Sequence, residues 1–212
     1  VALKKRINML GGAANVALNV KALGAEAILC SVIGNDKQGD EMLTLLKNAG
    51  LSEAGIIRSD RRITTTKFRI IGNRMQMLRI DEEIDTDLDP IDTAAILQRI
   101  TGLLATQKPD VIIFQDYNKG VLSPAVIEAV SEMAAKAGIP VAVDPKKKNF
   151  SVYKGITLFK PNLKEVSEGL KIDVNPRSVE SLQEAADALH VSQDVNMVMI
   201  TLSEHGVFIS AK

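Results

Sequence analysis

The sequence predicts an α/β protein built around a mostly parallel sheet. Short apolar segments, typical of buried strands, alternate with helical segments along most of the 212 residues. Several of these apolar segments end in polar residues, as strands do at the ligand-binding edge of an open parallel sheet. One stretch, residues 64–80, breaks the alternation and has hairpin chemistry. We therefore expect one domain with a small appendage, and 46% hydrophobic residues can supply its core.

The first elements are predicted in chain order. Residues 1–10 favour a strand with one wet face, and because an α/β domain usually opens with a buried strand, we expect a segment upstream. A helix from about Ala13 ends at Gly24, a typical residue after a helix C-terminus. An apolar strand over 27–33 and a helix over 40–48 follow.

The middle of the chain predicts a β-hairpin. β-Branched residues over 64–71 and an apolar segment over 75–80 flank the turn residues Gly72 and Asn73. This segment contains four basic residues: Lys67, Arg69, Arg74 and Arg79. Together they suit a lid over an anionic ligand, and the alternative for each one of them is a solubilised sheet edge. We expect lid strands at about 1–10 and 55–81, and we expect exposed apolar residues of the hairpin to pair with a second copy in a homodimer.

Past Pro90 the alternation returns. Ser123 and Pro124 form a cap and first helical position, and Gly138 ends that helix. The predicted helices are 91–106, 123–136, a short one from Asn162 and a longer one over 178–189; the predicted strands are 111–114, 141–143, 156–159, 195–201 and 207–210. Strands separated by helices predict parallel pairing with right-handed crossovers.

The amino-acid composition argues against nucleic acid and membranes as binding partners. Lys plus Arg and Asp plus Glu both number 26, so there is no basic field for nucleic acid and no polybasic block for a membrane surface. No apolar run is long enough to span a membrane, and the first residues lack the apolar core of a signal peptide. Cys30 is the sole cysteine and is expected to be a buried small residue. These features predict a cytoplasmic domain of enzyme size.

The segment Gly11-Gly12-Ala13-Ala14-Asn15 is the first candidate binding element. Two glycines let the backbone approach a ligand, and the following helix start directs free N–H groups toward it. Asn15 lies off the apolar stripe of the helix, where its amide can reach the same ligand. The alternative is a loop that only needs glycine's positive φ angles.

Polar residues follow four of the apolar segments. They are Gln115 to Gly120, Asp144 to Lys146, Lys160 to Glu165 and Thr201 to Gly206. Each set is also compatible with ordinary turns and caps. Asn162 and Glu165, three residues apart on one helix face, can hold a hydrated Mg²⁺ that bridges phosphates. His190 and His205 lack neighbours at zinc-ligand spacing and are expected at the surface.

The motifs that are absent exclude other classes. No Gly-x-Gly-x-x-Gly, P-loop or Gly-x-Ser-x-Gly motif is present, which argues against a dinucleotide-binding enzyme, a P-loop enzyme and an α/β-hydrolase.

The combined motifs resemble the ribokinase (PfkB-type) family of carbohydrate kinases. They are Gly-Gly-Ala-Ala-Asn at 11–15, the Asp116 loop, Asp144-Pro145-Lys146, Pro161-Asn162-x-x-Glu165 and Thr201 to Gly206. Within that family, Leu78-Arg79-Ile80-Asp81 and Asp116-Tyr117-x-Lys119-Gly120 are most similar to the kinase module of bifunctional heptose 7-phosphate kinase/ADP-heptose synthases. The resemblance covers essentially the whole chain and implies a three-layer α/β/α kinase fold with a β-hairpin lid, incomplete at both ends.

The resemblance also implies a reaction. It would be ATP- and Mg²⁺-dependent phosphorylation of D-glycero-β-D-manno-heptose 7-phosphate at the anomeric hydroxyl, in ADP-heptose and lipopolysaccharide core biosynthesis. A nucleotidyltransferase domain, fused or separate, would be the partner. The alternatives are another sugar or sugar-phosphate kinase of the family and, from another class, a non-catalytic sugar- or nucleotide-binding module.

Residue roles follow from the same resemblance. Substrate would contact Gly11, Gly12, Asn15, Arg79, Asp116 and Lys119. The nucleotide and its Mg²⁺ would be served by Asn162, Leu163, Lys164, Glu165, Thr201, Ser203, Glu204 and Gly206, with Asn162 and Glu165 nearest the metal. Two departures from the family pattern stand out: Ser203 replaces a frequent glycine, and the Gly-Ala-Gly-Asp segment that carries the general base is expected beyond Lys212. This chain alone is therefore predicted to be inactive.

Overall fold

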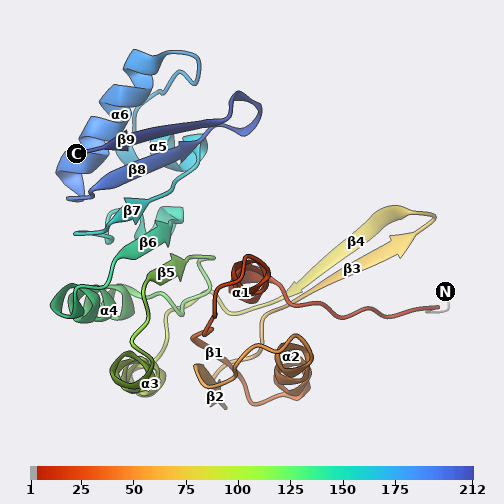
Figure 1. Ribbon diagram of the computed structural model, residues 1–212. Coiled ribbons are helices and arrows are strands. Elements are labelled where there is room, and N and C mark those ends of the chain that lie inside the picture. Colours follow the sequence, from red (N-terminus) through yellow and green to blue (C-terminus); the bar gives the residue numbers. More distant parts are fainter. Residues whose placement is uncertain (1–3) are drawn as a thin grey trace. The chain divides into compact units, whose positions relative to one another are not determined.

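The computed structural model describes residues 4–212 (Figure 1). The chain divides into two compact units, Val1–Ile84 and Asp85–Lys212. The first unit opens with residues 4–10, which form no strand; residues 1–3 lie outside the described part of the chain. The strand predicted over residues 1–10 is therefore wrong over 4–10. These residues alternate poorly and carry Lys4, Lys5 and Arg6, which favour exposure to solvent over pairing.

The α/β part of the first unit contains two helices and two parallel strands. Its elements are α1 (Gly12–Ala22), β1 (Ser31–Gly34), α2 (Lys37–Asn48) and β2 (Ile56–Ser59), with β1 paired to β2. Ala14 and Ala17 of α1 pack with Ile33, Leu46 and Ile56 in one buried cluster. Small side chains let the helix lie close to the strands, so this core fixes the position of α1, which begins at Gly12.

The predicted hairpin is confirmed. Strands β3 (Thr66–Gly72) and β4 (Met75–Glu82) pair in antiparallel fashion, and Figure 1 shows them projecting from the α/β part of their unit. The turn residues are Asn73 (φ 50°) and Arg74 (φ 63°), one position later than predicted. Two left-handed residues match the twist of a hairpin. Residues 56–59 form β2, which pairs with β1 rather than with the hairpin.

The register gives the hairpin two unlike faces. Phe68 lies opposite Ile80, and Ile70 lies opposite Leu78, which makes one face apolar. The alternating positions carry charges, with Lys67 opposite Asp81 and Arg69 opposite Arg79. The apolar residues are largely exposed: Leu78 is 50% and Ile80 46% accessible. We call these two surfaces the apolar face and the charged face of the hairpin.

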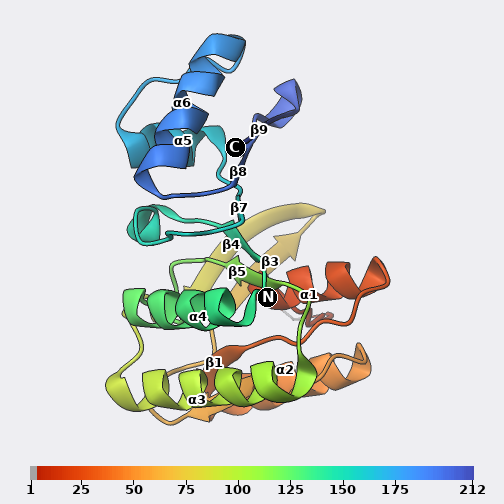
Figure 2. The same cartoon turned by 60° about the vertical axis from the view of Figure 1, so that its left-hand side comes forward.

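The second unit contains a five-stranded sheet whose order follows the chain, β5-β6-β7-β8-β9. Its elements are α3 (Pro90–Gln107), β5 (Ile112–Gln115), α4 (Pro124–Ala137), β6 (Val141–Asp144), η1 (Lys147–Asn149), β7 (Leu158–Phe159), α5 (Leu163–Leu170), α6 (Val179–Ser192), β8 (Met197–Thr201), η2 (Ser203–His205) and β9 (Val207–Ala211). The first four strands run parallel, and β9 is antiparallel to β8. Helices α5 and α6 lie beside β8 in both views of the unit (Figure 2).

The predicted caps hold the helices of this unit. Ser123 accepts the N–H of Val126, and Ser178 accepts the N–H of Ser181. Gly138 ends α4 with φ 67°. Because a cap fixes where its helix begins, the loop that precedes α4 is held at the end of β5.

His190 is not at the surface as predicted. It is 6% accessible, its Nδ1 lies 2.8 Å from the Val195 carbonyl oxygen, and its Nε2 lies 3.1 Å from Ser210 Oγ. It lies four residues after buried Ala186, on the face of α6 that packs on the sheet. Helical spacing from that apolar stripe would have revealed its position. His205, in η2, is exposed as predicted.

Within residues 4–212, no helix combines the length and apolarity that a membrane crossing requires.

Candidate functional site

Three neighbouring strands converge on the carboxylate of Asp144. Its Oδ2 accepts a hydrogen bond from Gln115 Nε2 at 2.8 Å, and its Oδ1 accepts one from Lys160 Nζ at 3.0 Å. These residues come from the ends of β6 and β5 and the position after β7, which are parallel neighbours. The prediction that polar strand ends share one edge of the sheet is confirmed for these three strands.

Asp116, directly after β5, is a buried carboxylate with 1% accessibility. Its Oδ1 accepts the Asn118 N–H at 2.7 Å, and its Oδ2 accepts the Tyr153 hydroxyl at 2.9 Å and the Asn149 amide at 3.0 Å. Burial and the nearby Asp116 charge raise the pKa of the Tyr153 phenol, which keeps its proton on the donor. Asp116 therefore anchors the loop that follows it.

That loop, residues 116–120, is held close to the segment before α3. Gly120 has φ 78°, and a Cβ there would lie 1.8 Å from the Thr86 carbonyl oxygen. The Gly120 carbonyl oxygen accepts the Leu88 N–H at 3.1 Å. Lys119 is half-buried on the same loop. Only glycine fits at position 120, because any side chain there would overlap the backbone of Thr86.

The start of α5 is a capping box. Asn162 Oδ1 accepts the Glu165 N–H at 2.9 Å, and Glu165 Oε2 accepts the Asn162 N–H at 2.9 Å. Glu165 Oε1 accepts a hydrogen bond from Lys146 Nζ. Burial opposes the charge of Lys146, but the hydrogen bond and charge of Glu165, with Asp144 and Asp116 nearby, raise the Lys146 pKa above its ordinary value. The ammonium therefore stays charged beside the helix start.

The two predicted nucleotide segments meet in the structure. Asn162 and Thr201 form an isolated parallel bridge, and the Thr201 N–H donates to the Pro161 carbonyl oxygen at 3.0 Å. Ser203 has φ 53° and Gly206 has φ 87°, so the loop after β8 turns through two left-handed residues. Ser203 thus adopts the conformation that a glycine would take most easily, and the loop keeps its turn despite the serine.

The other three predicted nucleotide residues, Lys164, Leu163 and Glu204, are exposed or half-buried. The Lys164 side chain is 83% accessible and lies 3.8 Å from Glu168, one turn along α5. Leu163 is half-buried at the first position of the helix, and Glu204 is exposed in η2.

The remaining candidates belong to the first unit. Gly11 is the N-cap residue of α1, and Gly12 begins the helix with φ 54°. Asn15 is exposed on the first turn, as its spacing predicted, while Ala14 and Ala17 are buried. Arg79 lies on the charged face of the hairpin, 57% accessible and 3.2 Å from Asp81.

Sequence reasoning missed several residues of this site. The sequence pattern marks Lys146 and Lys160 only as polar strand ends, although each places a cation beside a carboxylate. Tyr153 and Asn149, the two side chains that hold Asp116, carry no motif. Their proximity depends on the path of residues 145–157, which no local pattern reveals.

The same residues offer few ligands for a metal ion. Within residues 4–212 there is no group of three or more His, Cys, Asp and Glu side chains arranged to hold an ion. The oxygens of Asn162 and Glu165 each accept a hydrogen bond but keep further lone pairs. Such oxygens fit a hydrated Mg²⁺, which keeps most of its waters, better than a fully coordinated ion.

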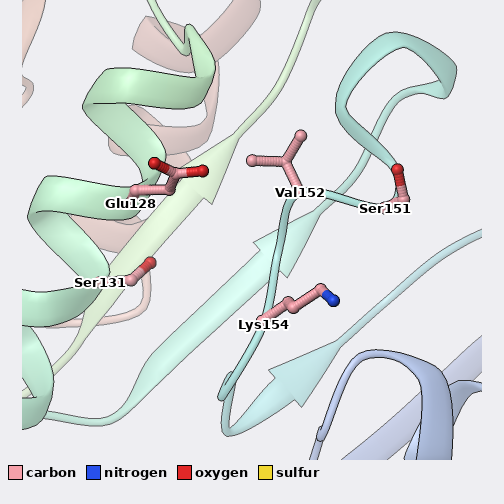
Figure 3. A pocket seen from close by; sticks show the side chains of 5 residues that line it. All are labelled: Glu128, Ser131, Ser151, Val152 and Lys154. Carbon is pink, nitrogen blue, oxygen red and sulfur yellow. The ribbon is translucent and has the colours of Figure 1, made fainter.

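A cavity of about 420 Å³ lies outside these residues. It is lined by Glu128 and Ser131 of α4 and by Ser151, Val152 and Lys154 of the segment after η1, which face each other in Figure 3. None of the five is a candidate site residue.

Comparison with known proteins gives the family. The pfkB family carbohydrate kinase model matches residues 5–212. The chain belongs to the pfkB family of carbohydrate kinases.

Curated pfkB relatives match over nearly the whole chain. The bifunctional protein HldE of Caulobacter vibrioides is 39% identical over 212 residues, and that of Wolinella succinogenes is 37% identical over 205 residues. The matches cover 100% and 97% of this chain but 43% and 42% of the relatives. The chain therefore spans about two fifths of the length of these relatives.

Solved structures share the pfkB fold. Phosphofructokinase-2 from Escherichia coli with fructose-6-phosphate superposes with a TM-score of 0.73 at 18% identity, covering 95% of this chain and 65% of the other. Ribokinase from Arabidopsis thaliana with ribose and ATP gives 0.66 at 15% identity, covering 94% and 62%. At such identities the likeness confirms the ribokinase-like fold, with its mostly parallel sheet.

Proposed function

We propose that this chain is the kinase part of an enzyme that phosphorylates D-glycero-β-D-manno-heptose 7-phosphate at the anomeric hydroxyl, with ATP and Mg²⁺. The observation that carries the proposal is the 39% identity to a bifunctional HldE over all 212 residues. The product would feed ADP-heptose and lipopolysaccharide core synthesis in the cytoplasm. The extra length of the relatives fits a nucleotidyltransferase domain in the same protein.

The sugar phosphate would be held by the Gly11-Gly12 backbone, the Asn15 amide, Lys119 and Arg79. Amide and ammonium groups suit hydroxyls and phosphate oxygens respectively. Asp116, whose oxygens accept bonds inside the protein, would act on the sugar side by fixing the loop that carries Lys119.

The nucleotide would lie along the segments 162–165 and 201–206, which are joined by the Asn162–Thr201 bridge. Lys146 and Lys160 would add positive charge for the phosphates, and Asn162 and Glu165 would hold a hydrated Mg²⁺. Bound Mg²⁺ would neutralise charge that develops during phosphoryl transfer.

The direct test uses the full-length protein. ADP release would be measured with heptose 7-phosphate, fructose 6-phosphate, ribose and fructose at equal concentrations. Selective turnover of heptose 7-phosphate supports the proposal. Preference for another sugar would point to a different kinase of the family. Tight sugar and nucleotide binding by calorimetry, without turnover, would instead point to a non-catalytic binding module.

Asn15→Ala should weaken sugar-phosphate binding about 5- to 150-fold, because a hydrogen-bonded pairing between the amide and a bound sugar, buried by that sugar, is worth roughly 1 to 3 kcal/mol. Affinity for an ATP analogue should stay unchanged. Asn19→Ala is the matched control, since Asn19 is also exposed on α1 but lies one turn, about 5.4 Å, further from the glycines. Titration calorimetry with each ligand measures both effects. Equal weakening of sugar and nucleotide by Asn15→Ala would contradict the assignment.

We also propose that the hairpin joins two copies in a homodimer through its apolar face. Phe68, Ile70, Leu78 and Ile80 share that face, and a two-stranded ribbon is marginally stable alone. A second copy would bury these side chains by the commonest symmetric arrangement.

Light scattering at micromolar concentration should therefore give a dimer mass for the unmodified protein and a monomer mass for Leu78→Glu, because a charge in an apolar contact is costly. Arg69→Gln, on the charged face of the same hairpin, should remain dimeric. A monomeric unmodified protein would refute the interface.

A further inference from the structure

The side chain of Asp36 ties the base of the hairpin to the α/β part of its unit. This residue follows β1 and is the N-cap of α2, where its Oδ1 accepts the Gly39 N–H at 2.7 Å. Its Oδ2 accepts the Thr64 N–H at 2.8 Å, across 28 positions in sequence. Thr64 lies two residues before β3, so the same carboxylate caps a helix and holds the start of the hairpin.

A second bond closes the arrangement. The Gly34 N–H, at the end of β1, donates to Thr64 Oγ1 at 3.0 Å, and Thr64 is 7% accessible. We call Gly34, Asp36, Gly39 and Thr64 the Asp36 clasp. Both glycines are required sterically: a Cβ on Gly34 would lie 2.7 Å from the Thr64 nitrogen, and one on Gly39 would lie 2.4 Å from the Gly34 carbonyl oxygen.

The surroundings of Asp36 in the clasp favour its ionised form. Partial burial opposes its charge, but the bonds from Thr64 and Gly39, with Arg58 nearby, lower the Asp36 pKa below its ordinary value. An ionised acid with two separate oxygens can accept both N–H groups at once. A neutral amide at this position would turn its NH₂ toward one of the two donors.

We propose that Asp36 is a positioning residue of the kinase, which fixes the angle at which the hairpin leaves its unit and so places the charged face that carries Arg79. This inference rests on the lid role in the proposed function. In that proposed function, Asp36 itself does not contact the substrate. The side chain acts through the Thr64 bond, while the Gly39 bond serves the helix.

Asp36→Ser separates these two bonds. A serine hydroxyl is a good N-cap and can still accept the Gly39 N–H, but it is too short to reach Thr64 as well. We expect the variant to fold with a melting temperature close to that of the unmodified protein. Asp40→Ser is the matched control, because Asp40 is exposed on the next turn and pairs only at the surface, 2.6 Å from Arg58.

The readout is the spread of hairpin orientations. Spin labels at Arg74→Cys on the turn and Lys47→Cys on α2, in a Cys30→Ser background, would be measured by pulsed electron spin resonance, with excess unlabelled protein. Asp36→Ser should broaden the distance distribution, and Asp40→Ser should leave it unchanged. In the full-length enzyme, Asp36→Ser should raise the sugar-phosphate KM roughly 5- to 30-fold, with a smaller change in kcat.

An unchanged distance distribution in Asp36→Ser would overturn the inference, whatever the enzyme activity. An equal broadening in Asp40→Ser would overturn it too, because the effect would then be general to α2. Absence of kinase activity in the unmodified protein would instead refute the proposed function and leave the spin-label result to stand by itself.

Discussion

Gly120→Ala is expected to destabilise the second unit by more than about 3 kcal/mol, because the new methyl group would meet backbone rather than a movable side chain. The Cβ would lie 1.8 Å from the Thr86 carbonyl oxygen and 2.6 Å from its carbonyl carbon. The positive φ of 78° adds strain for any residue with a Cβ. The loop anchored by Asp116 or the segment before α3 would have to move.

Gly138→Ala is the matched control for this experiment. Gly138 also has a positive φ, 67°, but a Cβ there has no atom within 4 Å. We expect it to lose only about 1 to 2 kcal/mol, the cost of the left-handed conformation. Urea unfolding followed by circular dichroism compares the two variants. Similar losses would mean that conformation, rather than the close approach to Thr86, determines the requirement for glycine.

Asp116→Ala should cost about 3 kcal/mol or more, since it removes the acceptor from several buried donors at once. The Asn118 N–H, the Asn149 amide and the Tyr153 hydroxyl all point at this carboxylate within 3.0 Å. Asp110→Ala, at an exposed position just before β5, should change stability by less than about 0.5 kcal/mol.

A double-mutant cycle checks the reason for the loss. Tyr153→Phe removes one donor and keeps the ring, which packs 5.9 Å from Phe114 and 6.3 Å from Phe159 between centroids. Its cost in the Asp116→Ala background should be smaller than in the unmodified protein by about 1 to 2 kcal/mol. Additive losses would show that the hydroxyl contributes nothing through Asp116.

The fold was largely predictable because its elements have strong local patterns. Ser123 with Pro124, Asn162 and Ser178 mark helix starts, and the turn of the hairpin was misplaced by only one residue. The failures lie where the pattern is weak. Residues 4–10 alternate poorly, and the segment 56–59 gives no sign in the sequence that it pairs with β1 rather than with the hairpin.

The sequence predicts which strand ends meet at the candidate site, but it does not predict most of the side-chain contacts there. The bridge between Asn162 and Thr201 follows from parallel neighbours whose ends share an edge of the sheet. The partners of Asp116 do not follow, because Tyr153 and Asn149 reach it across 37 and 33 positions. The contact between Asp36 and Thr64 does not follow either, because only the folded chain brings together two residues 28 positions apart.

The order of the five-stranded sheet has a consequence for synthesis on the ribosome. From β6 to β9, every strand pairs with its predecessor in the chain, so each new strand can join the sheet as soon as it emerges. No strand must wait for a later segment to be inserted between it and its neighbour. Pairing between consecutive strands keeps each loop closure as short as the intervening crossover allows, which limits the time for which unpaired strand edges are exposed.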